Sequence, residues 1–281
     1  MSWQASSVRS LGIAEPVGSV SARLGEGPRW DADAERLLWV DIEGGLLHAG
    51  ERSIDCGAKV CAAAPWEHDT VLVALADALA EVRLTDASVT RLVDVPHGQP
   101  RMRCNDGACD AAGRFWIGTM AEDETPGAGA LYRYEPDGLL HTVLTGVTLS
   151  NGLGWDADAR LMYYVDSPTQ RVDVLDFDLT SGAVADRRPF AAIPEPDGIP
   201  DGLAVDDEGG VWVALYGGGE VRRFAPDGRP SERVEVPAAR VTACCFAGSR
   251  LFVTTRGGLF ALDVPYSGPP AQRFGRARLT P

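Results

Sequence analysis

Four acid or amide side chains in this sequence recur in the same short pattern, each directly before a glycine. They stand in Glu26-Gly27, Asp106-Gly107 (preceded by Asn105), Asn151-Gly152 and Asp201-Gly202. Each pair lies about eleven residues before an apolar run of β type. Carboxylate and amide oxygens, without a sulfur or imidazole beside them, form the donor set that hard divalent cations prefer. The pattern therefore indicates a metal site, provided that the fold brings these side chains together.

A simpler interpretation is that these pairs are turns, repeated because the structural unit is repeated. The turn interpretation accounts for the glycines. It also accounts for an aspartate that follows each glycine four residues later, or three residues later in the case of Gly107. For the glycines and these aspartates we prefer this interpretation. The aspartates are Asp31, Asp110, Asp156 and Asp206. It does not account for Glu26, a poor turn residue in the same register as Asn151 and Asp201.

Six apolar runs of β type predict the elements that position these side chains. They are Leu37-Leu38-Trp39-Val40, Val71-Leu72-Val73, Phe115-Trp116-Ile117, Met162-Tyr163-Tyr164-Val165, Val211-Trp212-Val213 and Leu251-Phe252-Val253. They recur about 43 residues apart, the period of four-stranded propeller blades. The repeat predicts an all-β chain that forms a single six-bladed β-propeller domain over residues 1–281. A β-sandwich would also have short strands, but it gives no reason for this period.

Equivalent positions in repeated blades lie at equivalent radius and height around the propeller axis. We therefore expect Glu26, Asn105, Asn151 and Asp201 to converge on one end of the central channel. Blades two and six carry Ala62 and Thr242 in that region, so the ring should be asymmetric.

Composition excludes several other classes. Asp and Glu outnumber Lys and Arg by 40 to 26, and the net charge of −14 repels nucleic acid. No window has the apolar length of a membrane-spanning helix, and residues 1–22 lack the apolar core of a signal peptide. Two Cys-x4-Cys pairs suggest zinc, but the spacing is unusual and no His is near. We interpret the six cysteines as small buried side chains and predict a cytoplasmic protein without an obligate protein partner.

Five stretches resemble the signatures of the SMP-30/gluconolactonase/regucalcin-like family. They are Gly25-Glu26-Gly27-Pro28-Arg29-Trp30, Arg103-Cys104-Asn105-Asp106-Gly107, Gly118-Thr119-Met120, Ser150-Asn151-Gly152-Leu153 and Pro200-Asp201-Gly202. They occur in family order, and the similarity runs through nearly the whole chain. The resemblance implies a six-bladed propeller with one divalent cation in the axial channel. It also implies hydrolysis of sugar lactones, such as gluconolactone or a pentonolactone, to aldonic acids.

The resemblance also assigns roles to individual residues. Glu26, Asn151 and Asp201 match the family's three metal ligands, and Ca, Mg, Mn, Zn and Fe(II) all accept such a set. Arg103 and Asn105 match the pair that holds the sugar oxygens. Glu122 or its neighbour Asp123 falls where the family often has an acid that contacts substrate, and we take Glu122 as the candidate.

In the implied reaction the cation polarises the lactone carbonyl, and Asp201 is the candidate general base. For Arg103 the alternative is a structural salt bridge to Asp106. Two other functions stay open. One is a hydrolase of the same propeller type that acts on phosphoesters or aryl esters, and the other is a non-catalytic cation-binding propeller.

Overall fold

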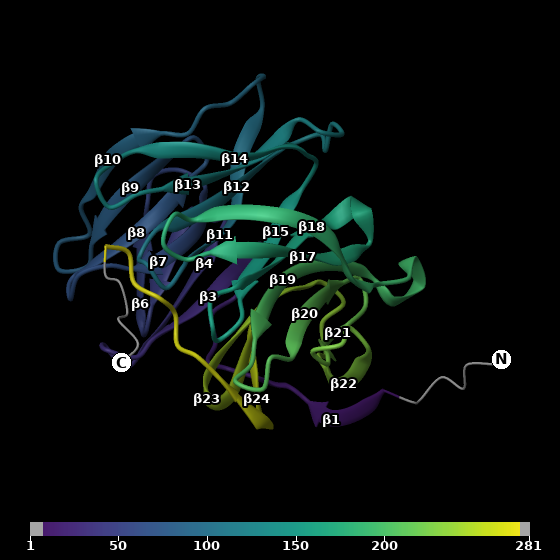
Figure 1. Ribbon diagram of the computed structural model, residues 1–281. Coiled ribbons are helices and arrows are strands. Elements are labelled where there is room, and N and C mark those ends of the chain that lie inside the picture. Colours follow the sequence, from purple (N-terminus) through teal and green to yellow (C-terminus); the bar gives the residue numbers. More distant parts are fainter. Residues whose placement is uncertain (1–7, 276–281) are drawn as a thin grey trace.

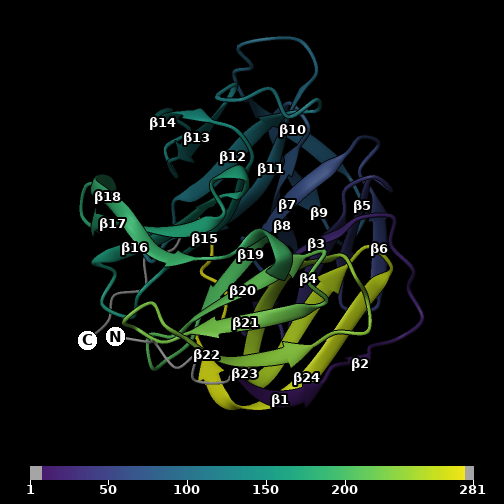
Figure 2. The same ribbon diagram turned by 90° about the vertical axis from the view of Figure 1, so that its right-hand side faces the viewer.

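The computed structural model describes residues 8–275; residues 1–7 and 276–281 of the predicted domain lie outside the described part. Its strands form six sheets arranged around a central channel (Figures 1 and 2). The prediction of an all-β, six-bladed β-propeller is therefore confirmed. The helices of the described part are two single 3₁₀ turns, η1 (Ser167–Thr169) and η2 (Glu195–Asp197). No helix within residues 8–275 is long and apolar enough to cross a membrane.

Each blade is a meander of antiparallel strands that runs from the channel to the outside. The innermost strands are β3 (Gly25–Asp31), β7 (Val60–Pro65), β11 (Met102–Cys109), β15 (Ser150–Trp155), β19 (Ile199–Val205) and the first part of β23 (Val241–Thr255). The second strands are β4 (Arg36–Asp41), β8 (Thr70–Leu75), β12 (Phe115–Ala121), β16 (Leu161–Asp166), β20 (Val211–Tyr216) and the later part of β23. Five of the six predicted apolar runs lie in β4, β8, β12, β16 and β20, and the sixth lies in β23.

Two further rings of strands complete the blades. The third strands are β5 (Leu46–Ala49), β9 (Ala78–Arg83), β13 (Gly129–Tyr134), β17 (Arg171–Asp178), β21 (Glu220–Phe224) and β24 (Gly258–Gly268). The outer strands are β6 (Arg52–Asp55), β10 (Val89–Asp94), β14 (Leu140–Val147), β18 (Ala183–Ala192), β22 (Pro230–Glu235) and β2 (Glu15–Pro16).

The amino-terminal part of the chain joins the last two blades. The strand β1 (Arg9–Ile13) pairs in parallel with β22 of blade five, and β2 pairs antiparallel with β24 of blade six. Figure 2 shows both of these purple strands along the outer edges of the green and yellow sheets. Blade six thus takes its outer strand from the opposite end of the chain, which closes the ring.

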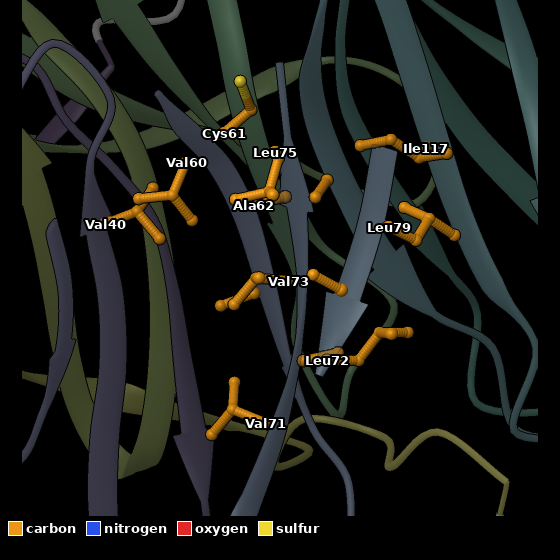
Figure 3. Packing of buried hydrophobic residues seen from close by; sticks show 14 of the residues in the cluster. Val40, Val60, Cys61, Ala62, Val71, Leu72, Val73, Leu75, Leu79 and Ile117 are labelled. Carbon is orange, nitrogen blue, oxygen red and sulfur yellow. The ribbon is translucent and has the colours of Figure 1, made fainter. Parts of the chain in front are cut away.

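The apolar core lies between the blades. Every residue of β7 and β12 is buried, because a blade is covered on both faces by its neighbours. Figure 3 shows this packing for Val71, Leu72 and Val73 of β8, which are fully buried. Strands covered on both faces read as continuous apolar runs rather than as alternating ones, which explains the pattern in the sequence. The outer strand β10, in contrast, is largely exposed, and it carries the polar residues Thr90, Arg91 and Asp94.

Candidate metal and substrate site

A break in strand pairing marks the same point of five blades. The ladder between the first and second strands shifts at Glu26–Arg29, Val60–Ala62, Cys104–Gly107, Ser150–Leu153 and Pro200–Leu203. Such β-bulges re-aim the side chains of the bulged strand and are frequent beside active sites. Because the shift recurs in five blades, it presents equivalent side chains of these blades at one end of the channel, as the repeat predicts.

Five side chains, one from each of these blades, occupy this position, and all are buried. They are Glu26, Cys61, Asn105, Asn151 and Asp201. In blade six Thr242 is also buried, and its hydroxyl donates to the backbone oxygen of Gly25. The expectation of Ala62 in blade two is wrong, because the ladder shifts between Val60 and Ala62 and leaves Cys61 at the bulge. The expectation of a ring without sulfur is therefore also wrong. The Cys61 thiol lies within hydrogen-bond reach of Arg103, although burial still raises its pKa.

The glycines that follow the site residues permit close approach of neighbouring blades. A Cβ atom on Gly152 would lie 2.7 Å from the backbone oxygen of Asp201, and one on Gly202 would lie 2.4 Å from Cβ of Ala243. Both glycines lie inside strands, β15 and β19. The interpretation as turn glycines is thus wrong for Gly152 and Gly202, since innermost strands touch there with no room for a side chain, whereas Gly27 has a φ of 51° and open space around it.

The same interpretation is confirmed for Asp110, Asp156 and Asp206, whose carboxylates accept hydrogen bonds from backbone N–H groups of their turns. Asp31 instead pairs with Arg36 and Arg273. Oδ2 of Asp110 accepts hydrogen bonds from Nε1 of Trp116 at 2.8 Å and from Nε of Arg114 at 2.7 Å. Asp206 repeats this arrangement with a tryptophan and an arginine of its own blade. These carboxylates stabilise the blades and are not candidates for chemistry.

A chain of side-chain hydrogen bonds connects three of the predicted residues. Nη1 of Arg103 donates to Oδ1 of Asn105 at 2.6 Å, and Nδ2 of Asn105 donates to Oδ1 of Asn151, also at 2.6 Å. Nδ2 of Asn151 donates to Oγ of Ser167 at 2.7 Å, and Ser167 donates to the backbone oxygen of Pro200 at 2.6 Å. Because the amide nitrogen of Asn151 donates its hydrogen bond to Ser167, the amide oxygen of Asn151 is the atom that faces the site.

Sequence reasoning missed Ser167. It is 2% exposed and begins η1, directly after the last residue of β16. No repeat of the blade pattern marks this position, and a serine before a proline looks like an ordinary turn. Its role follows only from the hydrogen bonds that it makes to Asn151 and to the residue preceding Asp201.

The buried carboxylates of the site oppose one another. Burial, and then the charge of Asp106, raise the pKa of Glu26 to about 8. Burial, and then the charges of Glu26 and Asp106, hold the pKa of Asp201 well above its ordinary range. The charge of Arg103 acts on both groups in the opposite direction. A bound cation would relieve this repulsion, so two carboxylates and one oriented amide oxygen fit a divalent metal ion.

Asp106 and Arg103 are not partners. Asp106 forms its salt bridge with Arg29, at 3.4 Å between Oδ1 and Nη2. Within residues 8–275, Arg103 has no carboxylate at ion-pair distance and donates instead to Asn105 and to the backbone oxygen of Cys104. The alternative of a structural Arg103–Asp106 salt bridge is therefore wrong, and the half-buried guanidinium of Arg103 can face a ligand.

Glu122 lies at the rim of this end of the channel. Its carboxylate accepts a hydrogen bond from Nζ of Lys59 at 2.6 Å, and this contact lowers its pKa. The charge of Arg103 also acts on Glu122. Asp123 instead accepts hydrogen bonds from Thr125 within a turn. Of the two acids, Glu122 is thus the one that lies within the electrostatic reach of Arg103.

The cysteines give no sign of a zinc site. All six are buried and free, in agreement with their interpretation as small core side chains. In the described part of the chain, no group of three or more His, Cys, Asp and Glu side chains is arranged to hold a metal ion. The candidate set of Glu26, Asn151 and Asp201 contains only two such residues and takes its third oxygen from an amide.

Comparison with known proteins gives consistent similarities. The SMP-30/gluconolactonase/LRE-like region matches residues 24–257. Pentonolactonase XacC of Haloferax volcanii is 37% identical over 287 residues, covering 92% of this chain and 96% of the relative. Regucalcin of Gallus gallus is 35% identical over 256 residues, covering 86% of each chain. A solved calcium-binding protein, regucalcin from Agrobacterium tumefaciens, superposes with a TM-score of 0.90 at 26% identity, covering 95% of this chain and 99% of that one.

Proposed function

The chain belongs to the SMP-30/gluconolactonase/LRE-like family, and on that premise we propose that it is a lactonase that opens sugar lactones to aldonic acids with one bound divalent cation. The observation that carries the proposal is the pair of mutually repelling buried carboxylates, Glu26 and Asp201, beside an amide oxygen held in place by Ser167. Glu26, Asn151 and Asp201 would hold the cation. When bound, the cation supplies Lewis-acid polarisation of the lactone carbonyl and lowers the pKa of water.

The residues of the chain itself account for positioning and proton transfer. Arg103 presents a planar set of N–H donors to the ring and carbonyl oxygens of the substrate. Asn105 fixes the guanidinium of Arg103 at one end and the amide of Asn151 at the other. Substrate orientation and the proposed metal set are therefore built on one rigid hydrogen-bonded unit, which favours attack in a single geometry.

Asp201 is the proposed general base. In its ionised form it accepts a proton from water as the water oxygen bonds to the carbonyl carbon. When the bond between the carbonyl carbon and the ring oxygen breaks, that proton passes to the ring oxygen, which becomes a hydroxyl group of the open acid. The balance is one water consumed and one hydroxy acid formed. Glu122 at the rim would contact the substrate hydroxyl groups.

The test compares hydrolysis of gluconolactone, xylonolactone and paraoxon by the purified protein, with and without a chelator and after return of Ca²⁺, Mg²⁺, Mn²⁺ or Zn²⁺. We expect lactone opening that is lost with the chelator and restored by at least one ion. The Arg103→Ala variant should lose turnover while it keeps its metal content, since a guanidinium has no lone pair for a cation.

Other outcomes would replace the proposal. Faster cleavage of paraoxon than of either lactone would indicate an aryl-ester or phosphoester hydrolase. Bound metal without hydrolysis of any of the three compounds would indicate a cation-binding propeller. Loss of metal from Arg103→Ala, measured by elemental analysis, would make Arg103 a support of the metal site rather than a substrate residue.

A further inference from the structure

Lys59 is the only lysine in the sequence, and it lies at the same end of the channel as the candidate site. It directly precedes β7, two residues before Cys61 at the bulge of blade two. Nζ of Lys59 donates a hydrogen bond of 2.6 Å to Oε1 of Glu122, which directly follows β12 of blade three. This ion pair therefore connects two neighbouring blades at the rim.

Blade two supplies no residue to the candidate metal set, but it contacts two of the proposed substrate residues. Lys59 holds Glu122, and the Cys61 thiol lies within hydrogen-bond reach of Arg103. In the ladder of blade three, Arg103 pairs with Met120, and Glu122 lies two residues beyond Met120. Positions two residues apart in a strand share a face. Arg103 and Glu122 thus belong to the face of blade three that blade two covers.

The contacts of Glu122 leave one of its carboxylate oxygens for a ligand. Oε1 accepts the hydrogen bond from Lys59, and this bond lowers the pKa of Glu122 and so favours its ionised form. Oε2 lies 3.7 Å from Nε of Arg101 and accepts no hydrogen bond from residues 8–275. The backbone nitrogen of Glu122 donates to the backbone oxygen of Arg101 at 2.8 Å. An ionised carboxylate only accepts hydrogen bonds, so Oε2 suits a donor such as a hydroxyl group.

Stability does not explain the pair of Lys59 and Glu122. The side chain of Lys59 is 42% exposed, and that of Glu122 is 31% exposed. Ion pairs at such exposure contribute little to stability, because water screens the charges and two long side chains lose rotational freedom. The same loss of freedom favours ligand binding, because a glutamate that is already fixed need not be ordered when the ligand arrives.

We propose that Lys59 is a positioning residue of the lactonase and that, by holding Glu122 from the neighbouring blade, it favours lactones that carry hydroxyl groups. This inference rests on the proposed function. A hydroxyl group of the substrate donates to Oε2 of Glu122, while Arg103 faces the ring and carbonyl oxygens. A lactone without hydroxyl groups gains nothing from Glu122. Lys59 itself touches neither the substrate nor the candidate metal residues, and it acts through Glu122.

The kinetic test compares wild type with Lys59→Met, Glu122→Gln and the double variant, each at saturating metal, with gluconolactone as substrate. Lys59→Met should raise KM about three- to tenfold, the worth of one hydrogen bond, and leave kcat within about twofold, since binding is lost equally in the ground and transition states. Glu122→Gln should raise KM at least as much. The double variant should match Glu122→Gln alone, because Lys59 acts through that residue.

Three controls accompany these variants. Lys59→Arg keeps the cation and should bring KM back to within about twofold of wild type. For δ-valerolactone, which has no hydroxyl group, KM should be the same in wild type and Lys59→Met; if this lactone is not opened, its inhibition constant replaces KM. Arg188→Met breaks an exposed ion pair with Asp176 of blade four and should change neither KM nor kcat.

Because Lys59 is the only lysine, its side chain can also be observed alone. Reductive methylation with ¹³C-formaldehyde labels this lysine and the α-amino group and keeps the charge of each. Lys59→Arg identifies the lysine signal in the NMR spectrum by removing it. Glu122→Gln should shift this signal, whereas Arg188→Met should not.

Four outcomes would overturn the inference. The first is an unchanged KM in Lys59→Met, and the second is an equal rise in KM for δ-valerolactone. The third is a double variant whose KM rises by the product of the two single effects, which would mean that Lys59 binds substrate directly. The fourth is a lysine signal that is the same in wild type and Glu122→Gln. Circular dichroism checks that each variant is folded. Absence of lactone opening by wild type would overturn the proposed function itself, whereas normal opening with any of these four outcomes would overturn only the role of Lys59.

Discussion

The side-chain amide of Asn105 donates a hydrogen bond of 2.6 Å to Oδ1 of Asn151. This bond joins the residue expected to hold substrate to a residue expected to hold the cation. The two side chains come from neighbouring blades, at equivalent bulges of β11 and β15. A substitution of either residue should therefore affect both substrate binding and metal binding, so this pair of residues tests whether the two are coupled.

Asn105→Asp should lower lactone turnover about 10- to 100-fold. The substitution removes the N–H donor and places carboxylate oxygens against Oδ1 of Asn151 and the backbone oxygen of Ser150, both of which now accept hydrogen bonds. It also adds a negative charge near buried carboxylates that already repel one another. Steady-state kinetics with matched metal occupancy checks this. Turnover equal to wild type would mean that the amide bond does not position Asn151.

Ser167→Ala should weaken metal binding about 10- to 100-fold, the usual effect of losing a group that orients a ligand. The hydroxyl accepts from Nδ2 of Asn151 and donates to the backbone oxygen of Pro200, so its loss removes both of these hydrogen bonds. Stability should fall by about 1–3 kcal/mol. Metal titration and urea unfolding measure the two effects. Ser181→Ala, in an exposed turn, is the matched control and should change neither.

The fold was predictable because each blade repeats one pattern at one period. Innermost and second strands are buried on both faces, so the apolar runs are continuous and easily aligned. The register of the site residues followed from the same repeat, and it brought Glu26, Asn105, Asn151 and Asp201 to equivalent bulges. Glu26 was the informative residue, because turn chemistry does not explain a glutamate in the same register as Asn151 and Asp201.

Other features of the site were not predictable, because they depend on contacts between blades. The bulge that places Cys61 rather than Ala62 in the ring shifts the ladder by a single residue, which no local pattern marks. A glycine is needed at position 202 because Ala243 of the next blade leaves no room for a side chain. The sequence of a single blade does not show this contact. The pairing of Asp106 with Arg29 likewise joins residues far apart in the chain.

The metal-free protein should lose stability as the pH rises from about 5 to about 8. The pKa of Glu26 is raised from an ordinary 4.5 to about 8 in the folded state, so the folded protein binds more protons than the unfolded chain in this range. Thermal unfolding at several pH values measures the loss. Bound metal needs the ionised carboxylate, so the stabilisation by metal should grow over the same range. In Glu26→Gln, both the loss of stability with rising pH and the growth of stabilisation by metal should be smaller. If stability changed with pH as steeply as in wild type, other groups would be responsible for the dependence.

Arg29→Met should destabilise the protein by about 3 kcal/mol at pH 8, since it leaves Asp106 buried without its counter-charge. The loss should be smaller at pH 5, because burial already raises the pKa of Asp106 and a protonated carboxyl group needs no cation. Urea unfolding at both pH values checks the difference. The double variant Arg29→Met/Asp106→Asn should recover part of the loss at pH 8. Equal losses at both pH values would mean that Arg29 acts by packing rather than by charge.

Asp201→Asn should lower turnover more than Asn151→Asp does. Asparagine at position 201 keeps an oxygen for a cation but loses the carboxylate that would accept a proton, and loss of a general base costs about 10²–10⁴ in rate. Aspartate at position 151 keeps the oxygen and adds a charge, which should strengthen metal binding and lower turnover more mildly, although Ser167 then loses its N–H donor. Both variants need saturating metal, since Asp201→Asn also weakens binding. If metal-saturated Asp201→Asn turned over lactone at nearly the wild-type rate, Asp201 would hold the cation only, and proton removal from water would need no carboxylate at that position.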